Sequence, residues 1–201
     1  VRGEVAHHVD AAAEFVALKE QYASGLSFVD AADAVERYRS HLFGFDQLYR
    51  CFHRAAGLVE PTGWAVLHDL KALIEDAYSG WFMPQLSSAW GKVIDSGDGQ
   101  VNLSALGELP KQQDFFSAKV LHAQKSGVKR VFVLISDAFR YEAAEELSRK
   151  INSTNRLKAQ LDAMVGVLPS YTSLGMAALL PHKTLSYKAD GSVLVDGLPT
   201  A

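Results

Sequence analysis

Apolar residues in the first half of the chain recur with the period of an α-helix. From Asp30 onward they return at alternating steps of three and four residues, which aligns them along one face of a helix. These positions are Val35, Tyr38, Leu42, Phe45, Tyr49 and Phe52. A second apolar face follows Pro61, a residue suited to the first position of a helix, and Gly80 is its expected end. It comprises Trp64, Leu67, Leu70, Ile74 and Tyr78. With an Ala-rich helix over about 5–22 and a further helix over 81–94, these faces predict an N-terminal helical bundle.

The pattern changes after residue 95. Gly, Ser and Asp gather in 95–110 and Pro110 closes the segment, which predicts a helical region at 1–110 and a second domain at 111–201. The second part opens with a helix over 111–126 and then alternates between strands and helices. The expected elements are a buried strand at 131–136, a helix at 141–151, a strand at 161–168, a helix at 172–180, and a hairpin of 184–187 with 193–195. Such an order predicts a βαβ unit, a largely parallel sheet and hence an α/β fold.

Composition and charge add limits on function. A net charge of −3 argues against binding to nucleic acid through bulk charge alone. The single cysteine, Cys51, cannot form an internal disulfide, which favours a reducing, intracellular setting and a cytoplasmic location. No stretch approaches the ~20 uninterrupted apolar residues of a membrane helix, so no membrane partner is expected. The chain opens on Val1 and stops in a loop-like segment, and we expect it to be a piece of a longer polypeptide.

Asp137 directly follows the apolar run VFVLIS. Ligands bind beyond the carboxyl ends of strands in open α/β sheets, so an acid there faces the usual site. An aspartate is equally suited to cap the helix that begins near Arg140, and position alone leaves both roles open. The next residues exclude two kinds of site. A haloacid-dehalogenase-type site needs a second Asp two residues later, a von Willebrand-type metal site needs Ser there, and this chain has Phe139.

Thr172 lies between an expected strand end and a helix start, in Pro169-Ser170-Tyr171-Thr172-Ser173. Unpaired N–H groups at a helix start favour an incoming phosphate, and a hydroxyl there can point at it. A threonine hydroxyl is a weak nucleophile unless a metal activates it. The alternative is an N-cap, which Ser170, Thr172 or Ser173 could each supply, and the segment taken alone favours that alternative.

The two segments taken together resemble a known family, the PglZ proteins of bacterial BREX phage-defence systems, which belong to the alkaline phosphatase superfamily. The resemblance rests on KRVFVLISDAFRYE (129–142) and LPSYTSLGMAALL (168–180), and is specific over about 115–180. It implies a helical region followed by the first part of an alkaline-phosphatase-like α/β/α domain. It also implies a metal-dependent phosphoesterase, most directly a phosphodiesterase, that works with other BREX proteins on a phosphoester substrate, with nucleic acid among the candidates.

The resemblance also implies roles for individual residues. Asp137 takes the position of a metal ligand, and Thr172 takes that of the nucleophile, which also touches the metal; Ser173 is the second choice. The family's two-metal site, expected to hold zinc, uses further Asp and His ligands from later segments, so the site is incomplete here, and His182 does not match those positions. We expect the 201 residues alone to be inactive and to hold metal poorly, because zinc needs four or more ligands.

Other roles stay open. Arg140 could clamp a phosphate bidentately, although an arginine one turn into a helix more often pairs with a nearby acid. The histidines of the first half lack a metal-binding spacing or cluster, and structural roles are expected for them: His7, His8, His41, His53 and His68. The alternative to an enzyme is a non-catalytic assembly component that uses the phosphatase-like fold as a scaffold, which the long, aromatic-rich helical region favours.

Overall fold

The computed structural model describes residues 2–59, 66–95, 97, 106–107, 109–154 and 156–200. Backbone contacts divide the chain into two compact units. The helical unit comprises Val1–Gly107 and Arg140–Ala159, and the small-sheet unit comprises Glu108–Phe139 and Gln160–Ala201. The linear division expected at residue 110 remains a prediction. The segment 140–159, which follows Asp137 along the chain, packs with the N-terminal helices.

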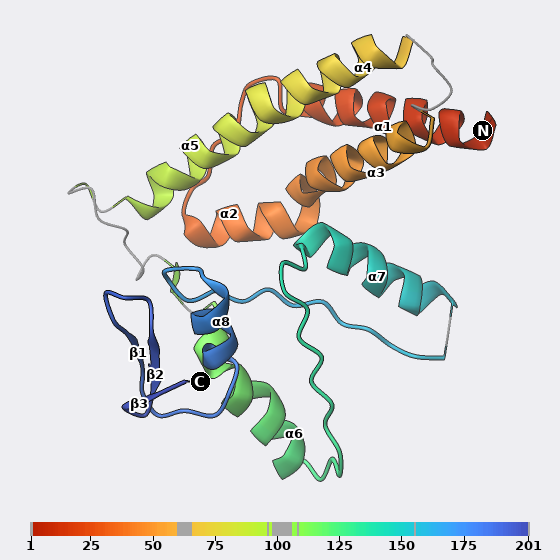
Figure 1. Ribbon diagram of the computed structural model, residues 1–201. Helices are drawn as coiled ribbons and strands as arrows, with labels where there is room; N and C mark the ends of the chain where they lie inside the picture. The colour runs from red at the N-terminus through yellow and green to blue at the C-terminus, as the bar shows by residue number, and fades with distance from the viewer. Residues whose placement is uncertain are drawn as a thin grey trace. The chain divides into compact units, whose positions relative to one another are not determined.

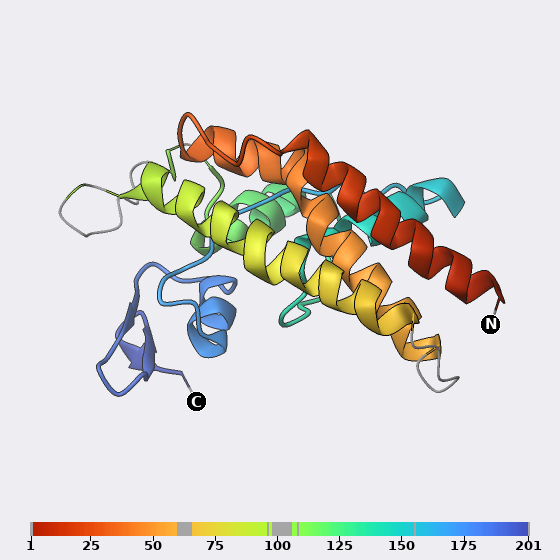
Figure 2. The same ribbon diagram turned by 90° about the horizontal axis from the view of Figure 1, so that it is seen from above.

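The helical unit consists of long helices that pack side by side (Figures 1 and 2). It begins with α1 (Arg2–Gln21) and continues with α2 (Ala31–Arg37), the π-helical η1 (Tyr38–Leu42) and α3 (Phe43–Val59). Next come α4 (Val66–Glu75), the π-helical η3 (Asp76–Phe82) and α5 (Met83–Ile94), and α7 (Tyr141–Thr154) joins from the later part of the chain. The helix α1 lies along α3, and α7 packs on α3.

Aromatic side chains form most of the core of the helical unit. Phe15, Phe45, Phe52 and Phe82 are fully buried, together with Leu42 and Ile74. The rings of Phe45 and Phe82 stack with centroids 4.3 Å apart. Burying a side chain of this size contributes roughly 1.5–3 kcal/mol, so these residues hold the helices together more strongly than helix propensity does. The face predicted from the three-and-four spacing is therefore confirmed at Leu42, Phe45 and Phe52.

The start of α2 shows why a helix forms there. The Asp30 side chain accepts a hydrogen bond from the Asp33 N–H at 2.8 Å, and Asp33 Oδ2 accepts one from the Val29 N–H at 3.0 Å. The first bond satisfies an N–H group of the first helical turn, and the second holds the residue before the N-cap, an arrangement close to a capping box. The expected helix start at Asp30 is confirmed.

Gly80 does not end its helix, contrary to the sequence-based expectation. The helix continues through η3 into α5, across Pro84. A glycine inside a helix costs about 1 kcal/mol, and the burial of Ala77, Tyr78 and Phe82 around it outweighs that cost. Pro61 and Trp64, which were expected to begin this helix, lie outside the described residues, as does most of the expected boundary segment 95–110.

The small-sheet unit contains short helices and an antiparallel sheet. Its first part holds η5 (Gln112–Asp114), η6 (Phe116–Leu121) and α6 (His122–Lys125), and Gly127 follows with φ +85°. Its second part holds α8 (Thr172–Ala178) and the strands β1 (Leu185–Tyr187), β2 (Val193–Val195) and β3 (Leu198–Pro199). The strand order is β1-β2-β3, with Leu185 opposite Val195 and Val195 opposite Leu198. The predicted hairpin is thus confirmed.

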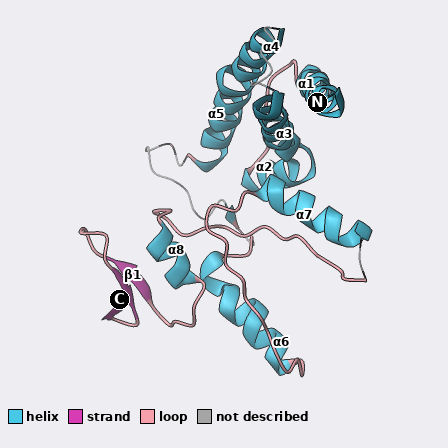
Figure 3. Cartoon of the chain, turned by 45° about the vertical axis from the view of Figure 1, so that its right-hand side comes forward, coloured by secondary structure: helices cyan, strands magenta, loops and turns pink. Residues whose placement is uncertain are grey.

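The two buried strands expected at 131–136 and 161–168 are absent. Both segments are drawn as loop in Figure 3, and Phe132 and Leu134 are 81% and 93% exposed. A strand that is apolar on both faces needs neighbouring strands and cover on each side. The parallel pairing described in this unit is a single bridge between Lys111 and Val165, so the hydrogen bonds that would define these strands are not made.

The described fold is therefore largely helical with a small antiparallel sheet, and the α/β/α arrangement stays a prediction. None of the described helices combines the length and the apolar character that crossing a membrane requires.

Candidate functional site

Thr172 and Asp137, which lie 35 residues apart in the sequence, meet in the small-sheet unit. The Thr172 hydroxyl points to Asp137 Oδ2, with the two oxygens 3.4 Å apart. This is long for an O–H···O hydrogen bond, whose usual length is about 2.7–2.8 Å. Both side chains are exposed. The pair is thus brought together, and it stays accessible.

The capping alternative for Thr172 is not realised. The helix α8 begins at Thr172 and its N-cap is Tyr171, whose side chain makes no cap hydrogen bond. The Thr172 hydroxyl is therefore directed at Asp137 and not at the helix N–H groups. Ser173, the second-choice nucleophile, is the next residue of the same exposed turn.

Burial on one side of α8 leaves the hydroxyl on the other. Leu174 and Ala177 of α8 pack with Val193 of the sheet, and partly buried residues surround them: Val167, Tyr171, Leu185 and Val195. Thr172, Ser173 and Met176 remain exposed. The apolar face of this short helix fixes its rotation, so the sequence pattern itself presents Thr172 to solvent.

Asp137 lies in a tight bend of the backbone. Its Oδ1 accepts a hydrogen bond from the Ala138 N–H at 3.0 Å, and Ala138 has φ +53°. For a residue with a Cβ this left-handed conformation costs about 1–2 kcal/mol. Strained residues of this kind gather at functional sites. The described hydrogen bonds of Asp137 thus go to its neighbour and to Thr172, which is not the helix-cap pattern that position alone left open.

The pair fits part of a metal site. Two oxygen ligands at about 2.0–2.2 Å from a tetrahedral zinc ion stand about 3.3–3.6 Å apart, and the Thr172 and Asp137 oxygens are 3.4 Å apart. Zinc requires at least two further ligands. The described part of the chain contains no group of three or more His, Cys, Asp or Glu side chains that could hold a metal ion. These residues alone therefore do not make a zinc site.

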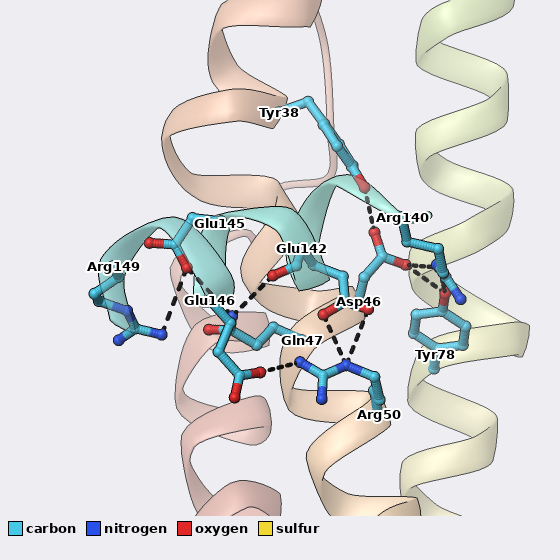
Figure 4. A network of polar contacts seen from close by, with 10 residues as sticks. All are labelled: Tyr38, Asp46, Gln47, Arg50, Tyr78, Arg140, Glu142, Glu145, Glu146 and Arg149. Carbon is cyan, nitrogen blue, oxygen red and sulfur yellow. Dashed lines mark hydrogen bonds and ion pairs between the residues drawn. The ribbon is translucent and has the colours of Figure 1, made fainter. Parts of the chain in front are cut away.

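Arg140 lies in the helical unit, where it is held by an acid (Figure 4). Its Nη2 donates to Asp46 Oδ1 at 2.8 Å and to the Tyr78 hydroxyl at 3.3 Å. The hydrogen bond with Tyr78 and the nearby Asp46 raise the pKa of Arg140. Pairing with an acid was one of the two roles expected for this residue. More than half of the side chain is exposed, and the phosphate-binding role stays a prediction.

Asp46 was missed by the sequence analysis. It is 4% exposed and accepts hydrogen bonds from the Tyr38 and Tyr78 hydroxyls as well as from Arg140. Burial and the hydrogen bond to Asp46 raise the pKa values of both tyrosines. The sequence could have indicated this buried acid, because Asp46 lies four residues after Leu42, a buried residue of the apolar face. That spacing places the Asp46 carboxylate on the same face of the helix.

Glu142, in the first turn of α7, is the second buried acid of this network (Figure 4). It is 1% exposed, and Arg50 Nε donates to its two carboxylate oxygens at 3.0 and 2.8 Å. The same arginine also pairs with Glu146, and that hydrogen bond lowers the pKa of Glu146. These contacts attach α7 to α3 and give Glu142 a structural role.

The histidines show no metal cluster within the described ranges. His53 lies 3.4 Å from Glu75 in the helical unit, and His182 Nδ1 lies 2.7 Å from the Leu180 carbonyl in a loop, as expected for it. The side chains of His7 and His8 lie outside the described residues. Burial raises the pKa of the Cys51 thiol, which fits a structural cysteine.

Comparisons with known proteins connect this geometry to a family. Residues 115–201 match the model of the BREX system PglZ alkaline phosphatase-like domain. The chain is 42% identical over 187 residues to the alkaline phosphatase-like protein BrxZ of Escherichia coli O9:H4 (strain HS), covering 92% of this chain and 22% of that protein. It is 34% identical over 165 residues to the alkaline phosphatase-like protein PglZ of Bacillus cereus (strain H3081.97), covering 82% of this chain and 19% of that protein.

The chain thus spans about a fifth of the length of these curated relatives. No solved structure matches it. The similarity to both relatives extends over most of the chain, and the domain match includes both Asp137 and Thr172. The chain therefore belongs to the PglZ family of BREX-system proteins.

Proposed function

We propose that the full-length protein is a cytoplasmic, metal-dependent phosphoesterase, most directly a phosphodiesterase, that acts as a component of a BREX anti-phage defence system. The observation that carries this proposal is the meeting of Asp137 and Thr172 in an exposed position, 3.4 Å apart. The family match to an alkaline phosphatase-like domain supports the reaction class. Other BREX proteins are the proposed partners, and a phosphoester, with nucleic acid among the candidates, is the proposed substrate.

In this proposal Thr172 is the nucleophile and Asp137 is a ligand to the metal. The Thr172 oxygen attacks phosphorus while the P–O bond to the leaving alcohol breaks, and that alcohol leaves with a proton in place of the one lost by the hydroxyl. Water then hydrolyses the phosphothreonine and restores Thr172. The Asp137 carboxylate beside the Thr172 oxygen holds it in place and accepts its hydrogen bond. A divalent metal, zinc by preference, would lower the pKa of the hydroxyl and neutralise charge on the phosphoryl oxygens when bound. The remaining ligands would come from elsewhere in the full-length protein, within an α/β/α domain whose first part this chain contributes.

Alanine substitutions in the full-length protein test the assignment. Thr172→Ala removes the nucleophile and Asp137→Ala removes a metal ligand, so each is expected to abolish hydrolysis of a model phosphodiester such as bis-p-nitrophenyl phosphate. Ser170→Ala, which removes a hydroxyl from the same segment, is the control and is expected to retain activity. Parental rates in either Thr172→Ala or Asp137→Ala would refute the proposed roles.

The 201 residues alone give a second test. Because Asp137 and Thr172 supply two ligands of the four that zinc needs, the isolated chain is expected to bind zinc weakly and to be inactive. Calorimetric titration with zinc measures this directly. Tight binding of one zinc per chain would contradict the expectation and would require ligands other than those named.

A non-catalytic assembly role is the second candidate. The observation that favours it is the helical unit, whose aromatic core and buried acids are built without any part of the Asp137–Thr172 pair. Two observations separate the candidates. Further Asp and His ligands in the full-length sequence would favour catalysis, and phage defence that survives alanine at both Asp137 and Thr172 would favour the scaffold.

A further inference from the structure

Gln112 lies at the junction of three segments of the small-sheet unit, just before the part of the chain that matches the family domain. Its backbone pairs with the segment around Val165: the Gln112 N–H donates to the Val165 carbonyl at 2.8 Å, and the Val165 N–H donates to the Pro110 carbonyl at 2.7 Å. These two bonds are the start of a parallel ladder between 110–112 and 165–167. The ladder would next join the Val167 N–H to the Gln112 carbonyl.

The side chain of Gln112 takes over that next bond. Its backbone carbonyl is occupied, because it accepts the Phe115 N–H in the 3₁₀ turn of η5. The side-chain oxygen Oε1 accepts the Val167 N–H instead, at 3.1 Å. One amide therefore extends the ladder by a residue at the point where the backbone turns away into a helix.

The other end of the same amide holds α8. Its Nε2 donates to the Gly175 carbonyl at 3.0 Å. Gly175 is one of the last four residues of α8, whose carbonyls have no regular partner within a helix. The Leu179 N–H, the regular partner of that carbonyl, donates to Met176 instead. A Cβ built on Gly175 would lie 3.4 Å from Nε2, at van der Waals contact, so the amide of Gln112 packs directly against this residue.

The two hydrogen bonds of the amide span the turn that leads to Thr172. Val167 precedes the Leu168-Pro169-Ser170-Tyr171 turn, and Gly175 lies one turn of helix after Thr172. We propose that Gln112 is a positioning residue for Thr172, which clamps both sides of the nucleophile turn and sets the direction of its hydroxyl. This inference rests on the proposed role of Thr172. A displacement of about 1 Å in a reacting group can cost about 100-fold in rate, so such a clamp matters for turnover.

The test uses two substitutions and a matched control in the full-length protein. Gln112→Ala removes both hydrogen bonds. Gln112→Glu has the same shape and keeps an acceptor for Val167, but it places a carboxylate oxygen against the Gly175 carbonyl. Gln113→Ala is the control, because Gln113 is an exposed glutamine in the same 3₁₀ turn. Thr172→Ala is assayed in parallel on the same model phosphodiester.

The expected result has two parts. Hydrogen exchange of the peptide covering 165–175 accelerates in Gln112→Ala and not in Gln113→Ala. The kcat per folded molecule falls about 10- to 100-fold in both Gln112 variants, KM stays within about twofold, and Gln113→Ala is unchanged. A purely structural role would lower the folded fraction and leave kcat per folded molecule intact, so the kcat per folded molecule separates the two.

Each contrary result points to a different failure. Unchanged exchange in Gln112→Ala would show that the clamp does not hold the turn. Parental kcat per folded molecule in Gln112→Glu, with Thr172→Ala inactive, would overturn the positioning role and leave the proposed function standing. Parental activity in Thr172→Ala would overturn the proposed function first, and the positioning role with it. Should Gln112→Ala fail to fold, Gln112→Glu carries the same kinetic comparison.

Discussion

Asp46 in the helical unit and Asp137 in the small-sheet unit carry the same carboxylate in opposite surroundings. Asp46 is 4% exposed and receives hydrogen bonds from Tyr38, Tyr78 and Arg140. Asp137 is exposed and receives one from the adjacent Ala138 N–H and a long one from Thr172. The first carboxylate has its oxygens occupied by the protein's own donors, whereas the second has room for an incoming ligand.

This difference separates a structural acid from a candidate catalytic one. A buried carboxylate must be paired, because an unpaired buried charge costs several kcal/mol, and its partners then fix the packing around it. An exposed carboxylate with spare acceptor capacity costs little to leave open and can bind a cation. Changing Asp137 to its neutral isostere Asn should therefore lower activity, whereas changing Asp46 to Asn should lower stability.

Asp137→Asn is expected to have the largest effect, on activity. If Asp137 is the metal ligand we propose, its loss should lower kcat/KM of the full-length protein by more than about 100-fold. Residues that only support a ligand reach about 100-fold when they are mutated. The melting temperature should stay near that of the parent, since exposed substitutions usually change stability by less than about 0.5 kcal/mol. Asp114→Asn, an exposed acid of the same unit, is the control. An equal loss of kcat/KM in Asp137→Asn and Asp114→Asn would mean that Asp137 has no special role in activity.

Asp46→Asn is expected to have the largest effect on stability. The amide nitrogen of Asn cannot accept a hydrogen bond, so one donor among Tyr38, Tyr78 and Arg140 loses its partner. Hydrogen bonds to charged groups contribute about 1.5–3 kcal/mol, so the free energy of unfolding is expected to fall by that amount. Urea unfolding, monitored by hydrogen exchange of α3, measures it. Asp10→Asn on the exposed side of α1 is the control. A change no larger than that of the control would mean that Asp46 is not a structural anchor.

High pH should weaken the helical unit by a smaller amount. Burial and a hydrogen bond to Glu75 raise the pKa of Tyr49 to about 12, and the pKa of Tyr78 is also raised. Because the folded-state pKa lies above the unfolded value of about 10, the protonated phenol stabilises the fold below pH 10. That contribution is lost as pH rises toward 12. After screening by solvent we expect a loss on the order of 1 kcal/mol.

Unfolding midpoints at pH 9, 10, 11 and 12 measure this loss, with tyrosine ionisation followed by absorbance. Tyr49→Phe cannot ionise and should show a shallower decline over the same range. An identical decline in the parent and in Tyr49→Phe would show that the hydrogen bond between Tyr49 and Glu75, 2.8 Å long, does not couple stability to pH.

Periodicity predicted the helix that follows Asp30, because the apolar face of that helix recurs in the sequence at steps of three and four residues. Leu42, Phe45 and Phe52 illustrate this. The sequence pattern does not predict the π-helical turns at 38–42 and 76–82, and it does not predict that the helix continues through Gly80. Packing between helices decides both features. Asp46 and Arg140 are 94 residues apart, and local patterns cannot pair them.

The candidate site was predicted in part for a different reason. The sequence contains an acid directly after an apolar run and a threonine at a helix start, and both can be recognised without the structure. The structure brings these two residues, Asp137 and Thr172, together. Gln112 could not be told from Gln113, because its role depends on which amide faces Gly175. The segment 131–136 has the composition of a buried strand, yet a strand exists only where its hydrogen-bonding neighbours are present.

Ser173→Ala is expected to have the smallest effect, and it sharpens the identity of the nucleophile. Successive residues of an α-helix are rotated by about 100°, so the hydroxyls of Thr172 and Ser173 leave α8 in different directions. The Thr172 oxygen is the one directed at Asp137, and activity of Ser173→Ala should therefore stay within about twofold of the parent. Steady-state assays of Ser173→Ala and Thr172→Ala form the matched pair. If Ser173→Ala were inactive and Thr172→Ala active, the nucleophile would be Ser173, and Asp137 would need a partner other than Thr172.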